Sequence, residues 1–437
     1  MSKRKGRLGP LASIVLCLLG SGGCSEEAAT GDEAVIKLGV FIREGGDSAD
    51  EILAAREINA AGGITIGDTH FAIELVREYD GASARGGAEA IEKFVEQGVI
   101  AAIGPRWSSI LLGDEPDFDN GAAAKAIESD MILISGNATS AAITTLEDDD
   151  LIWRTIASDE LQGEACAHFA YEERDVRRAA ILYRDDAWGR GLSARFTSVF
   201  EDLGGTVASA ESFDPELDLE GYAFPELEDV LADQPDMLFL LAFGESAQIT
   251  HRMVQGGHLE PYGDELPLIM ATDGSYDTNL LINAAPEVLP ILLGTLPGRG
   301  PSDPVRIAYG EAFEEAGFGP ALNAWPYPYD AIYVLAMAIQ SAQSLRTRDI
   351  KAHLQRVSID DGEDDLRVDP GEWADARQAL LDGREVDYNG ASGPIDFTAE
   401  GDPGAGFFAL WQIVEDGSGD FTIEFDDEST VEFGPGE

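Results

Sequence analysis

The sequence predicts an α/β protein made of two doubly wound lobes joined by a hinge. The 437 residues are more than one ordinary compact domain holds and are enough for two. Short apolar runs alternate with helical stretches in two successive series, as expected of repeated strand–helix–strand units. These apolar runs barely alternate with polar residues, which indicates parallel strands covered on both faces.

The first series begins after a polar stretch that ends near residue 34. Strands are predicted at 35–42, 71–78, 99–104 and 131–135, and helices at 50–60 and 84–97. Gly62 and Gly63 follow the first helix and suit a left-handed C-terminal cap, because glycine has no β-carbon to clash there. Gly98 ends the second helix.

The second series repeats the pattern, and a different C-terminal part follows it. Helices are predicted at 162–173, 192–203, 246–255 and 329–342, and strands at 179–184, 237–243 and 266–272. The segments 407–416 and 421–425 are predicted to close the chain as an antiparallel pair. No linker-like composition separates the two series near 154–158, which favours a hinge over independent domains.

The charge balance narrows the range of partners. The chain has 29 basic and 82 acidic residues, a net charge of −53. Nucleic acid is excluded as a partner, since duplex binding depends on Lys and Arg at the phosphates. Anionic lipid headgroups would also be repelled. The acidity favours solubility or a salty environment, and a calcium-binding acidic cluster is the alternative.

The N-terminus resembles a bacterial lipoprotein signal. Four basic residues within the first seven positions precede an apolar run at 11–19, which is too short to span a bilayer. Small residues then precede Cys24, the predicted lipidation site, although Ser21 stands where such signals usually have Leu. Residues 1–23 are therefore predicted as a signal peptide and 24–34 as an acidic tether. The alternative is an ordinary cleaved signal peptide with an incidental cysteine.

Only Cys166 remains in the folded part once Cys17 and Cys24 are assigned to the N-terminal signal. An internal disulfide and a zinc site built from several cysteines are excluded by number. Because Cys166 lies among Ala and Phe on a predicted helix, we expect it to be buried and inert.

Several segments, in order, carry a family resemblance. They are AAREINAAGGI (54–64), EQGVIAAIGPRWSS (96–109), ILISGNATSAAIT (132–144), WRTIASDELQG (153–163), AAILYRDDAWGRGLSARF (179–196), PYDAIYVLAMAI (328–339) and YNGASGPIDF (388–397). Together they resemble type I periplasmic solute-binding proteins, specifically the branched-chain amino-acid binding family of ABC importers. The similarity covers nearly everything from 35 to 415.

The resemblance implies a flytrap whose lobes close on a ligand. Lobe one would hold 35–156 and 274–335, and lobe two 157–273 and 336–437, with three crossings as the hinge. The segment 388–397 would belong to lobe two. The resemblance implies a solute-binding protein, so neither an enzyme nor a cofactor is expected.

Two loops after predicted strands suit a carboxylate. The loops at 104–109 and 135–140 offer hydroxyls and backbone N–H groups at the strands' carboxyl ends, where ligands bind in open parallel sheets. The resemblance places Ser108, Asn137 and Thr139 at ligand-contacting positions, and Ser109 lies beside them. The alternative is that these hydroxyls are plain helix caps.

Asp273 is the predicted partner of a ligand ammonium group. It follows a lobe-two strand at the position where the family has an acid with this role, although a turn-forming Asp before Gly274 is the alternative. Trp188 and Phe243 are predicted to cover the ligand, with plain core packing as the alternative. Trp325 and Tyr327 are weaker candidates for lining the cleft.

Two departures from the family put the ligand's identity in doubt. The loop at 42–48 carries Arg43 and Glu44 where the family commonly has Gly-Pro and hydroxyls. An acidic insert occupies 114–121, where the family continues into a helix. The insert misses EF-hand spacing, so we expect a solvated loop, with a loop-bound calcium as the alternative.

We therefore expect an exported, lipid-anchored protein that captures an amino acid or similar small zwitterion for an ABC permease. A ligand-sensing receptor subunit is the first alternative. A GDS-type hydrolase is the second, suggested by Gly46-Asp47-Ser48. It needs a late Asp-x-x-His, and Asp349 lies one residue too far from His353.

Overall fold

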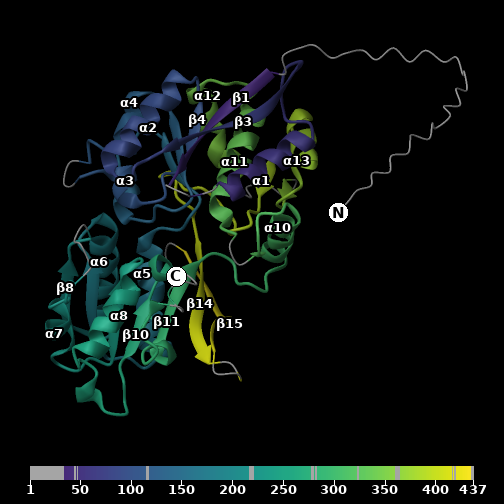
Figure 1. Ribbon diagram of the computed structural model, residues 1–437. Helices are drawn as coiled ribbons and strands as arrows, with labels where there is room; N and C mark the ends of the chain where they lie inside the picture. The colour runs from purple at the N-terminus through teal and green to yellow at the C-terminus, as the bar shows by residue number, and fades with distance from the viewer. Residues whose placement is uncertain are drawn as a thin grey trace, which may run out of the picture. The chain divides into compact units, whose positions relative to one another are not determined.

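The structure is a computed structural model, and two large β-sheets dominate it (Figure 1). It describes residues 34–43, 46, 48–114, 118–215, 221–276, 280, 283–321, 324–359, 365–415, 417 and 420–434. The predicted signal peptide, Cys24 and the tether up to residue 33 lie outside the described residues.

The first sheet has strand order β2-β3-β1-β4-β5-β6, and all neighbours are parallel except β2 and β3. Its strands are β1 (Ala34–Ile42), β2 (Ile64–Ile66), β3 (Thr69–Tyr79), β4 (Ala101–Ile103), β5 (Ile132–Ser135) and β6 (Ile152–Arg154). Ala101 and Ile103 pack into one hydrophobic core, whereas Ala102 packs into another. Both faces are therefore covered, which confirms the predicted winding.

Helices from both ends of the chain cover this first sheet. They are α1 (Ala49–Ala60), α2 (Ala84–Glu96), α3 (Ser108–Leu112), α4 (Ala122–Glu128), α10 (Pro304–Glu315), α11 (Pro326–Ala342), α12 (Thr347–Leu354) and α13 (Trp373–Leu381). The predicted cap of α1 is confirmed, since Gly62 and Gly63 have φ of 100° and 66°. A β-carbon on Gly63 would lie 2.1 Å from the carbonyl oxygen of Phe71, so only glycine fits.

The second sheet has strand order β15-β14-β11-β10-β9-β7-β8. Its strands are β7 (Arg178–Arg184), β8 (Thr206–Phe213), β9 (Met237–Leu241), β10 (Leu268–Ala271), β11 (Leu292–Pro297), β14 (Gly406–Glu415) and β15 (Phe421–Phe433). Its helices are α5 (Asp159–His168), α6 (Ala187–Asp202), α7 (Glu226–Leu231) and α8 (Glu245–Gln255). The strands β7 to β11 are parallel, and the predicted antiparallel pair β14–β15 closes the edge.

The predicted lobe boundaries are wrong in the second half of the chain. Residues 274–297 were expected in lobe one, but β11 pairs with β10, and Leu289 lies in the second sheet's core. Residues 326–335 of α11 lie in lobe one, as expected, beside α1 (Figure 1). The rest of α11 and the segment 388–397 were expected in lobe two, but they also pack into the first sheet's core. A small sheet of β12 (Leu366–Val368) and β13 (Val386–Tyr388) joins them there.

We therefore divide the chain into lobe one, 34–154 and 304–397, and lobe two, 159–297 and 406–433. The prediction failed because apolar composition indicates that a strand or helix is buried but does not indicate which of the two sheets it packs against. The chain still crosses between lobes three times, at 155–158, 298–303 and 398–405. Thr155, Gly298 and Pro403, one from each crossing, line the same narrow space.

Arg154 holds two of these crossings together. It is fully buried, and its guanidinium forms a two-point ion pair with Asp402, with N···O distances of 2.5 and 2.8 Å. It also donates to the carbonyls of Thr139 and Ser140 and to the Thr144 hydroxyl. All five of its N–H groups are thus used, which offsets the cost of burying its charge.

Candidate functional site

The two loops predicted to hold a ligand carboxylate follow β4 and β5 of the first sheet. Ser108 and Thr139 are both buried, and the Ser108 hydroxyl accepts a hydrogen bond from the Ser140 N–H at 3.1 Å. The Ser108 hydroxyl proton stays available for a ligand. Ser140 in turn donates to the carbonyl of Ala187 in lobe two at 3.2 Å, so the two lobes meet directly beside these groups.

Two other predicted residues of these loops have different surroundings. The Asn137 amide lies within its own lobe, beside the Trp325 indole N–H, which donates to the Gly136 carbonyl at 3.3 Å. Ser109 is half-buried, and its hydroxyl makes no hydrogen bond to the described residues. The structure therefore brings the loops of Ser108 and Thr139 together. Asn137 instead lies beside Trp325, and Ser109 takes no part in this hydrogen bonding.

Asp273 meets a second carboxylate, Asp159, which sequence reasoning missed. Asp159 opens α5 at the first crossing and is fully buried, and neither of its carboxylate oxygens has a hydrogen-bond partner of good geometry among the described residues. Its backbone N–H donates to the Thr139 carbonyl at 2.8 Å, which places it beside the lobe-one loop. Gln162, one turn along α5, donates to Asp273 at 3.0 Å and to the Thr295 hydroxyl at 3.2 Å.

The electrostatics of this acid pair are unfavourable without a cation. Burial, followed by the charge of Asp273, raises the pKa of Asp159 well above its usual value, and the Thr139 hydroxyl and Arg154 only partly offset this. Burial also raises the pKa of Asp273, and the Gln162 amide partly lowers it. Asp273 is partly exposed as a residue, but its carboxyl group is enclosed by protein. Such a pair suits a positively charged ligand group.

Aromatic side chains from both lobes surround the acids. Trp188, in the first turn of α6, is buried and lies 4.7 Å from Phe243, measured between ring centroids. Trp107 of lobe one stacks on Phe243 at 6.0 Å and an angle of 28°. The Arg184 guanidinium covers another side of the Phe243 ring at 4.2 Å. The structure thus brings Trp188 and Phe243 together, and Trp107 packs against Phe243 from lobe one.

Tyr327 lies at the crossings rather than on a cleft wall. Its carbonyl accepts from the Thr155 hydroxyl at 2.8 Å, and its own buried hydroxyl has no partner among the described residues. The charge of Asp273 contributes to raising the pKa of Tyr327, after burial, so its hydroxyl is within electrostatic range of the acid pair.

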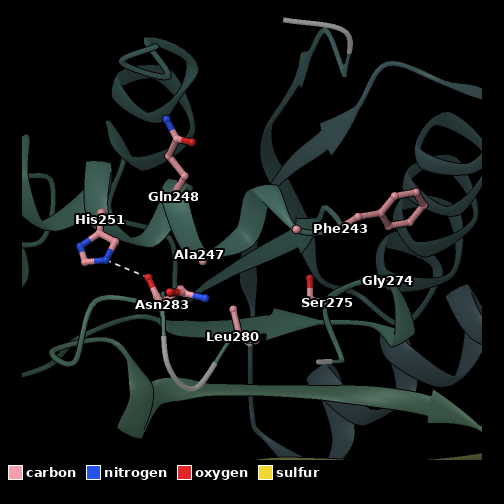
Figure 2. A pocket seen from close by; sticks show the side chains of 9 residues that line it. Phe243, Ala247, Gln248, His251, Gly274, Ser275, Leu280 and Asn283 are labelled. Carbon is pink, nitrogen blue, oxygen red and sulfur yellow. Dashed lines mark hydrogen bonds between the residues drawn. The ribbon is translucent and has the colours of Figure 1, made fainter. Parts of the chain in front are cut away.

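A cavity of about 400 Å³ adjoins Asp273 at the carboxyl ends of β9 and β10. Its lining residues are Phe243, Gly244, Ala247, Gln248, His251, Gly274, Ser275, Leu280 and Asn283. Figure 2 shows Gln248 and His251 on α8, with the His251 ring bonded to the Asn283 carbonyl at 2.8 Å. Because Gly274 follows Asp273 directly, this space adjoins the acid pair on the lobe-two side.

Two remaining predictions concern cysteine and metal chemistry. Cys166 is buried, as predicted, and burial raises its pKa to about 12, so the thiol is unreactive at neutral pH. The described ends of the acidic insert are joined by hydrogen bonds between Asp114 and Asn120, and residues 115–117 lie outside the description. Among the described residues, no cluster of three or more His, Cys, Asp and Glu is arranged to hold a metal.

Comparison with known proteins decides the family. The sequence model of the family described as "Periplasmic binding protein" matches residues 49–417. The chain belongs to this family. The fold is that of the type I periplasmic binding proteins, which include leucine-binding and isoleucine-binding members.

Solved structures agree with this fold for the periplasmic binding protein. A leucine-binding protein, LivK, from Thermotoga maritima is 22% identical with a TM-score of 0.67, over 92% of this chain and 99% of that one. A solute-binding protein from R. palustris in complex with 4-hydroxybenzoate is 15% identical with a TM-score of 0.68, over 92% and 97%.

A curated relative is similar over much of the chain. The chemotactic signal transduction system substrate-binding protein BasB of Halobacterium salinarum is 26% identical over 343 residues, which is 74% of this chain and 71% of the relative. In the described part of this periplasmic binding protein, no helix combines the length and apolar character that crossing a membrane requires.

Proposed function

We propose that the protein captures a small amino acid, or a close zwitterionic analogue, between its two lobes and releases it unchanged. The observation that carries this is the buried pair Asp159 and Asp273, neither of which forms an ion pair with a described residue. A ligand ammonium group would relieve the repulsion between them. The ligand carboxylate would lie against the Ser108 and Thr139 hydroxyls of the opposite loops.

Such a ligand favours the closed arrangement. Its carboxylate contacts lobe one and its ammonium contacts lobe two, so it binds the closed state better than an open one. Trp107, Trp188 and Phe243 would cover its apolar part and exclude water. Benzoate-type ligands, found in a structural relative, lack the ammonium group and would leave the acid pair uncompensated.

We propose an ABC permease as the partner, in line with the leucine-binding and isoleucine-binding relatives. Similarity to BasB, a chemotactic substrate-binding protein, favours one alternative, in which the loaded protein addresses a signalling receptor. In either case Cys24 would carry the lipid that holds the protein at the outer face of a membrane. Fractionation of Cys24→Ser tests the anchor, because the variant should leave the membrane fraction, and its retention there contradicts lipidation.

Catalysis is not part of the proposal. The hydrolase alternative requires a base beside Ser48, whose buried hydroxyl has no hydrogen-bond partner among the described residues. His353 bonds Ser341 on lobe one instead, at 2.8 Å. Without an activating base a serine hydroxyl is a weak nucleophile.

Calorimetry with purified protein and a panel of amino acids, amides, carboxylates and sugars tests the ligand. Asp273→Ala should weaken binding of the best amino acid by about 2–5 kcal/mol, since it removes one partner of a buried charge pair. Ser108→Ala should cost about 1 kcal/mol, as one hydrogen bond among several.

Glu201→Gln serves as the matched control. Glu201 is an exposed acid near the end of α6 in the same lobe, and its loss should leave affinity unchanged. Tight binding of an uncharged solute, or parent-like affinity of Asp273→Ala, would refute the amino-acid assignment without affecting the fold.

A further inference from the structure

Arg106 presents an unused guanidinium at the edge of the cleft. It lies in the loop between β4 and α3, directly before Trp107, and is half-buried. Among the described residues, no hydrogen bond or ion pair is made by its side chain, which acts only at longer range on Asp50 and Asp80. Its five N–H donors are therefore available, unlike those of Arg184 and Arg299, which bond nearby acids.

The two acids near Arg106 already have other partners. Asp50, at the start of α1, accepts hydrogen bonds from the Tyr309 hydroxyl and the Trp325 N–H. Asp80, just after β3, accepts from the Ala82 N–H. Both are buried, so neither is placed as a free surface carboxylate that would fold over the guanidinium. Basic residues are also few in this chain, which has 29 of them against 82 acidic residues and a net charge of −53.

Strand order places Arg106 on a definite side of the ligand groups. The carboxyl ends of β3, β1, β4 and β5 follow one another along the sheet edge. Ser108 and Thr139 belong to the β4 and β5 loops, and the acid pair adjoins the β5 side through the bond from the Asp159 N–H to the Thr139 carbonyl. Arg106 is on the β1 side, where both it and Arg43 are near enough to Asp80 for their charges to lower the pKa of that carboxyl group. The β1 side faces away from the acid pair, so Arg106 is placed to meet the remaining part of a ligand whose carboxylate and ammonium are held as proposed.

We propose that Arg106 binds the side-chain carboxylate of the ligand, which makes the preferred solute an acidic amino acid with one ammonium and two carboxylate groups. This inference rests on the proposed capture of an amino acid and adds the class of side chain. A planar guanidinium holds a carboxylate by two parallel hydrogen bonds, which a neutral side chain cannot match.

Titration calorimetry with glutamate, aspartate, glutamine and leucine tests the inference on the full mature protein. The parent should bind one of the two acidic amino acids at least about 10-fold more tightly than glutamine or leucine. Arg106→Gln should weaken that binding by about 10–100-fold and leave the affinity for glutamine within about 3-fold. Arg106→Lys should fall in between, since it keeps the charge but loses the forked geometry.

Arg77→Gln is the matched control. Arg77 is an exposed arginine on β3 of the same lobe, and its loss changes the net charge equally, so its affinities should match the parent's. If leucine or glutamine binds as tightly as the acidic amino acids, or if Arg106→Gln keeps the parent's preference, this inference is wrong and the amino-acid function stands. If no amino acid binds, both fail together.

Discussion

At the residue scale, Asp159 and Asp273 are proposed to bind the ligand, and as buried carboxylates they lower the stability of the ligand-free protein. Each is a carboxyl group enclosed by protein, and the pKa of each is raised by burial, with Asp273 adding to the shift of Asp159. A raised pKa means that the folded state binds the proton more tightly than the unfolded chain does. The resulting stability is present in full below the unfolded pKa of about 4 and is lost as pH rises through the folded pKa.

We therefore predict that Asp159→Asn stabilises the ligand-free protein at neutral to alkaline pH. The gain should be about 1–3 kcal/mol, because the neutral amide replaces a buried carboxylate whose charge is desolvated and lies near that of Asp273. It should vanish below about pH 4, where the parent's carboxyl is protonated in both states. Thermal unfolding of both proteins across pH measures this, with Glu201→Gln as a control. A less stable variant at pH 8, or an advantage that persists at pH 3, contradicts it. Amino-acid binding should weaken in the same variant.

Asp273 could be predicted as a site residue from its position after a strand, whereas Asp159 could not be predicted from the sequence. Asp273 directly follows a recognisable strand, where a parallel sheet presents its ligand groups. Asp159 follows Ser158, which caps α5 by accepting from the Glu160 N–H. An acid after a serine is the ordinary start of a helix, and only the crossing geometry turns it toward the cleft. Arg106 likewise carries no local pattern that separates it from a hydrated surface arginine.

At the scale of elements, the crossings depend on one ion pair. Arg154 ends β6, and Asp402 lies in the third crossing, so their contact joins segments about 250 positions apart in sequence. The same guanidinium holds the Thr139 and Ser140 carbonyls of the ligand loop. The pair therefore connects the hinge to the site.

Asp402→Ala is predicted to destabilise the protein by about 3–5 kcal/mol, because it leaves the Arg154 charge buried without its partner. Denaturant unfolding measures the loss. Glu89→Ala, which removes an exposed ion pair with Arg85 on lobe one, should have little effect by comparison. Equal unfolding midpoints for the two variants would mean that the crossing does not depend on the Arg154–Asp402 contact.

Element types were predictable where local pattern decides them, and lobe membership was not. The long apolar stretch predicted at 329–342 is α11 (Pro326–Ala342), and its residues are buried almost throughout. Nothing in its composition shows that it packs against β1 and β4 rather than β9 and β10. The strand β11 was assigned to the wrong lobe for the same reason, since any apolar strand fits either sheet.

At the scale of the whole molecule, acidic charge dominates. Removing residues 1–23 takes away four positive charges and no negative ones, so a processed chain is more negative than −53. Repulsion among these charges opposes the compact state and is screened by salt over a distance of about 8 Å at physiological ionic strength.

We predict that the thermal midpoint rises between low and about 1 M sodium chloride. Most of the rise should occur at the lower concentrations, where the screening length changes fastest. A parallel series in an uncharged sugar is the control, because a sugar stabilises proteins by preferential exclusion without screening charge. A flat or falling midpoint would show that surface repulsion does not limit stability.

The division of each lobe between distant segments has a consequence for how the protein is made. The strands of the first sheet leave the ribosome by residue 154, but the helix that covers one face, α11, follows only at 326–342. Until then, of the helices that cover Ile36, Leu38 and Ile103 on that face, α1 is present and α11 is not. The parallel strands of the second sheet are synthesised before the first lobe can be completed, and β14 comes later than both. No single cut in the chain therefore yields an intact lobe, and each half matures only when nearly the whole polypeptide is present.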